Sequence, residues 1–176
     1  MEAPHYHESA QAQYDRLYMG HAADLPASIR AATCDDDPFL VQLAARLADF
    51  DLPAWRTGQE IASADARAML AAVRARQRDD EVFVAERDGT PVGCLHVVAA
   101  TDFFGRRHAH ISVLATIAAA EGSGIGRALM AHAEDWARAR GYSLITLNVF
   151  AANTRARRFY EGTGFSPEVL KYAKPL

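Results

Sequence analysis

The sequence predicts an α/β fold: a single domain with a mixed, mostly antiparallel β-sheet flanked by helices. Three observations lead to this prediction. The chain has 176 residues, enough for one domain with a substantial core. Segments with apolar residues at helical spacing are interspersed with short apolar, strand-like runs. A glycine-rich turn at 121–126 lies between a strand-like run and a helical one.

Composition and charge exclude several classes of protein. The formal net charge of −3 argues against a duplex nucleic-acid binder, which normally has a basic excess. No apolar run approaches the ~20 residues needed to cross a bilayer. The first 20 residues lack the hydrophobic core of a signal peptide, and Cys34 and Cys94 are too few for a disulfide framework. We therefore expect a cytoplasmic protein with neither a nucleic-acid nor a membrane partner.

The first 26 residues are polar and poor in branched apolar side chains, so we expect a mobile extension at 1–26 and the domain at 27–176. The extension contains His5, His7 and His21. A His-x-His pair can bind a metal, but no Cys or carboxylate lies at ligand spacing. We expect no metal site there.

The first half of the domain predicts one strand and two helices. Residues 28–34 are expected to form a short strand. The Asp-Asp-Asp-Pro segment at 35–38 predicts a helix start, because acidic residues cap helices and proline fits the first turn. Residues 51–58 interrupt this helix, and a second helix is expected from about 63 to 78.

The next segments predict three strands. The first, at 82–86, leads through an Asp-Gly turn into a strand at 91–98, which is the pattern of a hairpin. A loop at 101–108 precedes a strand at 109–117.

The chain after the glycine-rich turn predicts two helices and two strands. One helix ends near Gly141, a strand follows at 143–150, and Asn153 caps a short helix that ends near 162. A last strand is expected at 168–173. The predicted order is β-α-α-β-β-β-α-β-α-β.

The glycine-rich turn, Glu121-Gly-Ser-Gly-Ile-Gly126, predicts an anion-binding loop. Glycines let the backbone approach a ligand, and a helix start presents free N–H groups to phosphate. A P-loop would need Gly-Lys-Ser/Thr, which is absent. A dinucleotide fingerprint would need a glycine where Arg127 stands. A coenzyme A pyrophosphate loop and a plain structural turn stay open.

An ordered set of segments gives a more specific signal. It comprises Ile111-Ser-Val-Leu-Ala-Thr116, Gly124-Ile-Gly-Arg-Ala-Leu129, Leu147-Asn-Val149, Asn153, Ala156, Tyr160 and Gly164-Phe165. Over residues 82–176 this set resembles the GCN5-related N-acetyltransferase (GNAT) superfamily. The resemblance implies acetyl-CoA as the donor cosubstrate and a splayed sheet whose gap holds the pantetheine arm.

The resemblance also implies roles for individual residues. The backbone at Ala115 and Thr116 would bond the pantetheine amides as an added strand would. The loop would wrap the pyrophosphate with Glu121, Gly122, Ser123, Gly124, Ile125, Gly126 and Arg127. Asn153 would contact the cofactor near the pantetheine, and Tyr160 would protonate the departing thiolate. The alternative for Tyr160 is a buried core side chain.

Glu121 departs from the family pattern, because this loop usually begins with Arg or Gln. A carboxylate repels a pyrophosphate, so we expect the Glu121 side chain to turn to solvent. Positive charge would then come from Arg127, or from Arg155, Arg157 and Arg158 on the following helix. The alternative for those three is an ordinary solvated surface.

His110 is the candidate general base. It stands where some family members carry a glutamate base, and imidazole titrates near neutrality. The alternative is a half-buried strand histidine that only packs or hydrogen-bonds. Glu86 and His96 on neighbouring strands are weaker candidates.

For the acceptor, the fold implies a pocket formed by the first two helices and the 101–108 loop. We expect Trp55, Asp102, Phe103 and Phe104 to line it, because rings and a carboxylate suit a cationic amine. The same residues are equally ordinary in a loop packed against the domain.

Together these features predict an N-acetyltransferase that uses acetyl-CoA and no metal. The acceptor is expected to be a primary amine of a small molecule, such as an amino acid, polyamine or aminoglycoside. No G-x-S-x-G elbow is present, so direct transfer without an acyl-enzyme is expected. The alternatives are a peptide or protein amine as acceptor, and a non-catalytic acyl-CoA-binding module. A homodimer is the candidate assembly.

Overall fold

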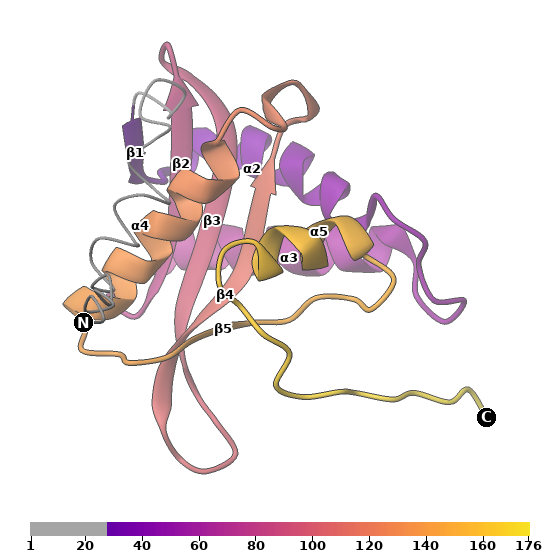
Figure 1. The fold of residues 1–176 in the computed structure, drawn as a ribbon. Coiled ribbons are helices and arrows are strands. Elements are labelled where there is room, and N and C mark those ends of the chain that lie inside the picture. Colours follow the sequence, from indigo (N-terminus) through magenta and orange to yellow (C-terminus); the bar gives the residue numbers. More distant parts are fainter. Residues whose placement is uncertain (1–27) are drawn as a thin grey trace, which may run out of the picture.

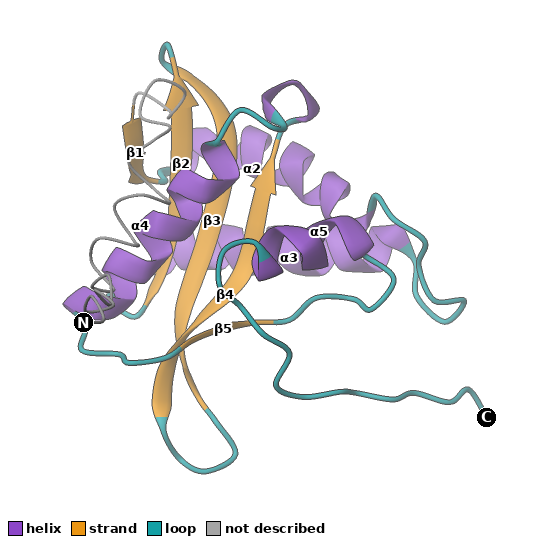
Figure 2. Cartoon of the chain, in the orientation of Figure 1, coloured by secondary structure: helices purple, strands orange, loops and turns teal. Residues whose placement is uncertain are grey.

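The computed structural model describes residues 28–176, so the predicted extension with His5, His7 and His21 lies outside the described residues. Its centre is a five-stranded sheet in the order β1-β2-β3-β4-β5 (Figures 1 and 2). The first four strands are antiparallel, and β5 runs parallel to β4. Their bounds are Ser28–Ala31, Asp80–Arg87, Thr90–Thr101, Arg107–Thr116 and Ile145–Leu147.

Helices cover both faces of the sheet. α2 (Asp37–Ala44) and α3 (Gly58–Ala75) lie on one face, and α4 (Ile125–Ala139) and α5 (Thr154–Glu161) lie on the other (Figure 1). Short 3-10 turns complete the set: η2 (Cys34–Asp36), η3 (Ala45–Ala48) and η4 (Ala118–Ala120). This is the α/β architecture with a mixed sheet that the sequence predicts.

Each face has its own apolar core. On the α4 side, Leu95 and Val97 of β3 pack with Ile125 and Leu129 of α4. On the α2 and α3 side, Leu40 and Met69 pack over Cys94. Burying each large aliphatic side chain contributes roughly 1.5–3 kcal/mol, so the two cores hold the helices firmly against the sheet.

The second helix begins earlier than predicted. α3 starts at Gly58, five residues before the expected position, because Thr57 and Glu60 form a capping box. The Glu60 backbone N–H donates to Thr57 Oγ1 at 3.2 Å, and the Thr57 N–H donates to the Glu60 carboxylate at 2.9 Å. The sequence carries the Thr-x-x-Glu signal for this helix start at 57–60. The helix ends at Ala75, and Arg76 has a left-handed φ of 47°.

The predicted last strand at 168–173 is wrong. Within the described residues no strand follows α5, and the chain runs away from the body of the domain (Figure 1). Val169, Leu170 and Tyr172 are largely exposed. The segment does contain apolar residues, but a strand also needs a partner, and no strand of the described residues lies beside it.

The sheet opens between β4 and β5, and this opening positions the site. The two strands pair at only three positions, ending at Ile111 opposite Leu147. β4 then continues to Thr116 with no partner on that side. A bulge contributes, because the β3–β4 register moves from Val97↔Ile111 to His96↔Val113 and leaves Ser112 unpaired.

Candidate active site

A cleft of about 1440 Å³ lies at this opening. The unpaired part of β4 forms one wall, and the chain at 148–150 after β5 lies opposite. The glycine loop, the first turn of α4 and the start of α5 form one end. The segment between α2 and α3 and Asp65 of α3 also line the cleft, and Arg46 in that segment reaches Glu121 of the glycine loop.

The glycine loop forms an anion-binding end of the cleft. Gly122 and Gly124 have φ values of 72° and 84°, a left-handed conformation that other residues rarely adopt. α4 begins directly after Gly124 and has no side-chain cap. Its first N–H groups therefore have no intrahelical acceptor and lie at the positive end of the helix dipole. Ser123 is not a free nucleophile, since its hydroxyl donates to the Ala120 carbonyl at 2.7 Å.

Gly126 brings α5 close to this loop. A Cβ at this position would lie 3.3 Å from Cζ of Phe159, which is tighter than an ordinary contact. The absence of a side chain at Gly126 thus lets Phe159 pack on the first turn of α4. This contact places α5, which carries Tyr160, beside the anion-binding end of the cleft.

Glu121 does not turn freely into solvent as expected. Its carboxylate accepts two hydrogen bonds from Arg155, at 2.7 and 2.9 Å, and also forms an ion pair with Arg46. The hydrogen bonds from Arg155 lower the Glu121 pKa, so the carboxylate stays ionised and paired. Arg46 could not be predicted, because nothing in the sequence indicates that η3, which carries it, meets the glycine loop.

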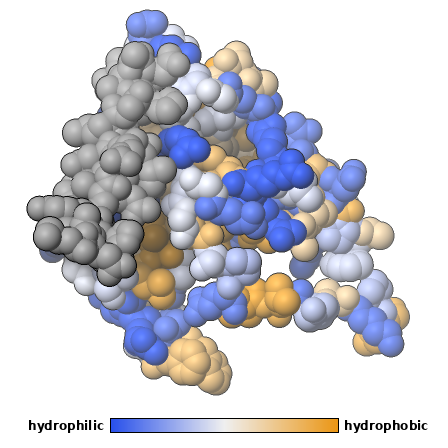
Figure 3. Space-filling view, in the orientation of Figure 1, coloured by the Kyte–Doolittle hydropathy of each residue, from blue (hydrophilic) through white to orange (hydrophobic). Residues whose placement is uncertain are grey.

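The surface over α5 is hydrophilic (Figure 3), and Arg155, Arg157 and Arg158 are all exposed. Of the three, Arg155 lines the cleft, as does Arg127 at the start of α4. The Arg157 side chain instead donates to the Ala151 carbonyl at 3.2 Å. Arg127 and Arg155 are therefore the arginines, of those considered from the sequence, that flank the anion-binding end.

α5 brings Asn153 and Tyr160 into the cleft. The Asn153 side chain caps the helix, with Oδ1 accepting the Ala156 N–H at 3.0 Å, so its amide N–H groups stay available. Tyr160 packs between Phe159 and Phe165, with ring centroids 5.4 and 6.0 Å away. Burial raises the Tyr160 pKa, so the phenol is protonated at neutral pH and can donate a proton.

The expected base, His110, does not line the cleft. Its Nδ1 lies 2.8 Å from Thr146 Oγ1 on β5. Its pKa is lowered by burial and by His108 and His96 nearby. The arrangement matches the alternative of a half-buried histidine that hydrogen-bonds across the sheet.

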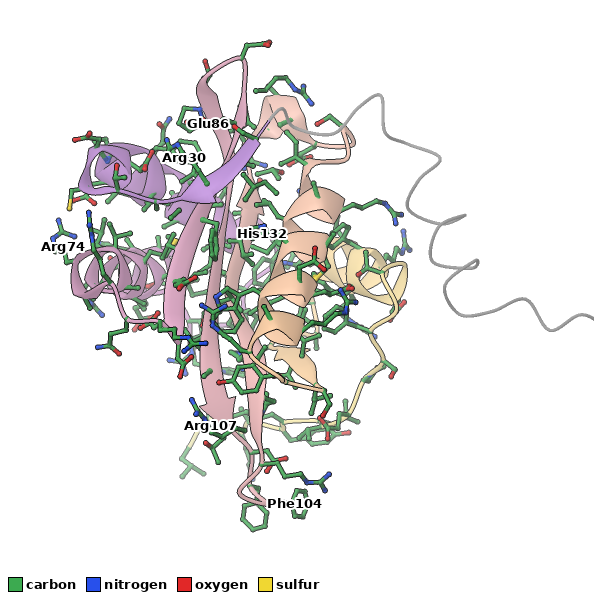
Figure 4. All side chains as sticks on the ribbon, turned by 90° about the vertical axis from the view of Figure 1, so that its left-hand side faces the viewer. Arg30, Arg74, Glu86, Phe104, Arg107 and His132 are labelled. Atoms are coloured by element: carbon green, nitrogen blue, oxygen red, sulfur yellow. The ribbon has the colours of Figure 1, made fainter. Side chains whose placement is uncertain are left out.

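The two weaker candidates are also outside the cleft. Glu86 accepts a 2.8 Å hydrogen bond from Arg30 at the β1 edge of the sheet (Figure 4). His96 is buried and its Nε2 lies 2.7 Å from Asp80 Oδ1.

The expected acceptor residues lie elsewhere, which corrects the prediction. Asp102 organises the β3–β4 turn, accepting the N–H groups of Phe104 and Arg106 at 2.8 Å. Phe103 and Phe104 are 96% and 75% exposed, and Phe104 projects at the far tip of the hairpin (Figure 4). Trp55 is also exposed and does not line the cleft. A self-contained turn built on Asp102 holds the rings away from the sheet opening.

Other aromatic and acidic residues line the cleft beside the α2–α3 segment. Phe50 and Phe150 lie with ring centroids 5.2 Å apart, joining the α2–α3 segment to the chain after β5. Asp49, Asp51 and Asp65 also line the cleft. Local sequence patterns do not single out these residues, because only the packing of α3 and the α2–α3 segment against the sheet brings them to the cleft.

The described residues contain neither a candidate metal-binding cluster nor a candidate membrane-spanning helix. Among residues 28–176, no group of three or more His, Cys, Asp or Glu side chains is arranged to hold a metal ion. None of the helices in this part of the chain is both long and apolar enough to cross a membrane.

Comparison with known proteins adds independent information. The model of the Acetyltransferase (GNAT) family matches residues 44–165. A solved structure of a transcriptional regulator from Bacillus halodurans C-125 is 31% identical, with a TM-score of 0.60, covering 84% of this chain and 99% of that one. A putative acetyltransferase from Agrobacterium tumefaciens str. C58 is 27% identical, with a TM-score of 0.61, covering 85% and 99%.

Among curated proteins, a mycothiol acetyltransferase from Beutenbergia cavernae is 47% identical over 57 residues. That match covers 32% of this chain and 19% of the relative, so the chain matches only about a fifth of that relative's length.

Proposed function

Because the chain belongs to the GNAT acetyltransferase family, we propose that it transfers an acetyl group from acetyl-CoA directly to a primary amine of a small molecule. The observation that carries the proposal is the convergence of three features in one cleft. These are the unpaired backbone of β4, the uncapped start of α4 and the protonated Tyr160.

The glycine loop, the β4 wall and the start of α5 suit coenzyme A. The first N–H groups of α4, with Arg127 and Arg155, would bind the pyrophosphate. The backbone at Ala115 and Thr116 would bond the pantetheine amides as a neighbouring strand does. Asn153 has amide N–H groups left for the same arm. Acetyl-CoA would supply the activated acyl group as a thioester.

The residues of the chain perform few chemical tasks in this scheme. The cleft holds the acceptor beside the thioester, which removes the entropic cost of bringing the two together. Tyr160 donates a proton to the departing sulfur, so that a neutral thiol leaves. No covalent acyl-enzyme is needed, since Ser123 is engaged with Ala120 and Cys94 is buried away from the cleft.

We assign the acceptor to the part of the cleft lined by Phe50, Phe150 and Asp65, here called the acceptor end, and its shape supports a small molecule. The Phe50–Phe150 contact bridges the α2–α3 segment and the chain after β5, which restricts the opening available to a folded protein. The partial match to a protein named mycothiol acetyltransferase also favours a small-molecule acceptor.

The test is thiol release from acetyl-CoA over a panel of amines, with acetyl-CoA binding measured separately by thermal shift. We expect acetyl-CoA to raise the melting temperature, and at least one small amine to drive thiol release. Binding without release for any small amine, or release with peptide amines alone, would contradict the proposed acceptor class. No thermal shift would contradict the donor assignment.

A further inference from the structure

Asp65 is a cleft residue that the proposed reaction has not yet used. It lies on α3, lines the cleft and is half-buried. No side-chain hydrogen bond or ion pair engages its carboxylate among residues 28–176. Glu121, at the other end of the cleft, is by contrast held by two arginines. An ionised carboxylate that is partly desolvated and unpaired is costly, so it calls for a cationic partner.

The surroundings of Asp65 explain why the protein itself supplies no such partner. Asp65 lies one turn before Met69, whose sulfur is 3.8 Å from Cys94 Sγ on β3. The titratable groups of β3 that act on Asp65 are Cys94 and His96. His96 is already bonded to Asp80 through Nε2, and its buried Nδ1 has no partner.

The remaining elements around this end of the cleft add no positive charge. Ser112 and Val113 of β4 are neutral, and the α2–α3 segment contributes the exposed acids Asp49 and Asp51. His110 of β4 has its pKa lowered by burial and by His108 and His96, which favours its neutral form. The arginines that line the cleft are Arg46, Arg127 and Arg155. Arg46 belongs to the α2–α3 segment, but its guanidinium, like that of Arg155, is paired with Glu121, and Arg127 lies in the first turn of α4. The acceptor end is therefore acidic.

We propose that Asp65 binds the ammonium group of a cationic acceptor amine in the cleft and takes its first proton. This rests on the proposed function and deepens it, because it defines the acceptor as an amine that is charged in solution. It also replaces His110 with a carboxylate that lines the cleft.

Every proton and bond in the proposed transfer is accounted for. An ammonium N–H bond breaks and an O–H bond forms on Asp65, giving a neutral amine and a neutral carboxylic acid. The nitrogen lone pair forms the C–N bond as the C–S bond breaks. Tyr160 gives its proton to sulfur and regains one from the acylated nitrogen. Asp65 then releases its proton to solvent, so one proton is liberated per amide formed.

Electrostatics favours this transfer inside the cleft. Burial raises the pKa of Asp65, which His96 partly opposes. Burial also lowers the pKa of an ammonium group, because both charged forms lose hydration. Moving the proton from nitrogen to the carboxylate removes both charges at once. The difference between the pKa of the ammonium group and the pKa of the carboxyl group is therefore smaller in the cleft than in water.

The test compares the wild-type protein with Asp65→Asn, using acetyl-CoA with two acceptors. One is 1,4-diaminobutane, which is protonated at pH 7, and the other is aniline, which is neutral. For Asp65→Asn we expect kcat/KM with the diamine to fall by about a hundredfold or more, with aniline changed much less. The decline of kcat/KM at acidic pH should also disappear. Asp135→Asn on the exposed side of α4 is the matched control and should behave as the parent.

Acetyl-CoA binding separates the possible failures. Retained thermal shift in Asp65→Asn shows that the fold and the donor end are intact. Equal losses with both amines, or no loss with either, would overturn the role of Asp65 while leaving the acetyltransferase proposal in place. A wild-type protein that acetylates neither amine, but binds 1,4-diaminobutane in an Asp65-dependent manner by calorimetry, would overturn the reaction and keep the ammonium site.

Discussion

Glu121 and Arg155 form a two-pronged ion pair that ties the start of the glycine loop to α5, with hydrogen bonds of 2.7 and 2.9 Å. Arg46 reaches the same carboxylate from η3. A negative charge at the anion-binding end is thus neutralised by two cations drawn from different elements. The arrangement keeps those cations next to the loop whether or not a phosphate is present.

The first prediction concerns this pair. Glu121→Gln removes a negative charge and releases Arg46 and Arg155, so we expect acetyl-CoA to bind about three- to tenfold more tightly, in line with charge-assisted contacts to phosphate. Calorimetric titration of acetyl-CoA at low salt measures this. Glu134→Gln, on the part of α4 outside the cleft, is the control. Weaker binding by Glu121→Gln would mean that the pair is needed to shape the loop.

The second prediction concerns Tyr160. Tyr160→Phe removes the phenolic proton and keeps the ring between Phe159 and Phe165. We expect kcat to fall by about 10²–10⁴-fold, the usual contribution of a positioned acid. The dissociation constant of acetyl-CoA should stay within about twofold, because the packing is kept. Thiol-release kinetics and thermal shift measure the two quantities. Unchanged kcat would remove Tyr160 as the acid.

The third prediction concerns Gly93, where α4 approaches the sheet. A Cβ there would lie 3.0 Å from the Ala115 carbonyl oxygen and 3.1 Å from Ile125 Cγ2. Because backbone and a fully buried side chain cannot both move aside, Gly93→Ala should lower the free energy of unfolding by about 1–3 kcal/mol. Urea denaturation measures it, with exposed Thr90→Ala as the control. An unchanged midpoint would show that α4 shifts without cost.

The fourth prediction is a pH dependence of stability. The buried Asp36 carboxylate accepts two 2.8 Å hydrogen bonds from Arg30 and one from the Thr33 N–H. The hydrogen bonds from Arg30 hold the Asp36 pKa below its ordinary value. Its contribution is therefore complete above the unfolded-state pKa of about 3.9 and is lost as pH falls through the folded-state pKa.

Asp36→Asn checks this contribution. We expect it to lower the free energy of unfolding at pH 7 by about 2–4 kcal/mol, because Arg30 and the Thr33 N–H lose a charged acceptor. The difference between the variant and the parent should shrink as pH falls below about 4. Urea titrations at several pH values measure both. A difference that is independent of pH would assign the effect to packing.

The parts of the fold that local patterns determine were predictable from the sequence. The Asp-Gly hairpin and the glycine-rich loop before α4 lie where the sequence places them. Asn153 caps α5 as predicted, with its side chain on the Ala156 N–H. In each case the residues that determine the conformation are neighbours in the chain.

The parts that depend on contacts between distant segments were not predictable. Nothing local indicates that Arg46 meets Glu121, or that Phe50 meets Phe150 one hundred positions away. The same reason explains the error at 168–173, where the apolar residues have no strand to pair with among the described residues. It also explains the acceptor residues: Phe103 and Phe104 have suitable chemistry, but the turn at Asp102 points them away.

In the proposed reaction, main-chain groups at the opening between β4 and β5 bind the donor, and side chains bind the acceptor. On the β4 wall the groups offered to the donor are peptide amides and carbonyls, which every residue except proline possesses in full. The acceptor end is built from side chains of the α2–α3 segment and α3, among them Phe50 and Asp65. Substitutions in these side chains can therefore change which acceptor is bound without altering how acetyl-CoA is bound. The same fold can in this way evolve toward different acceptors.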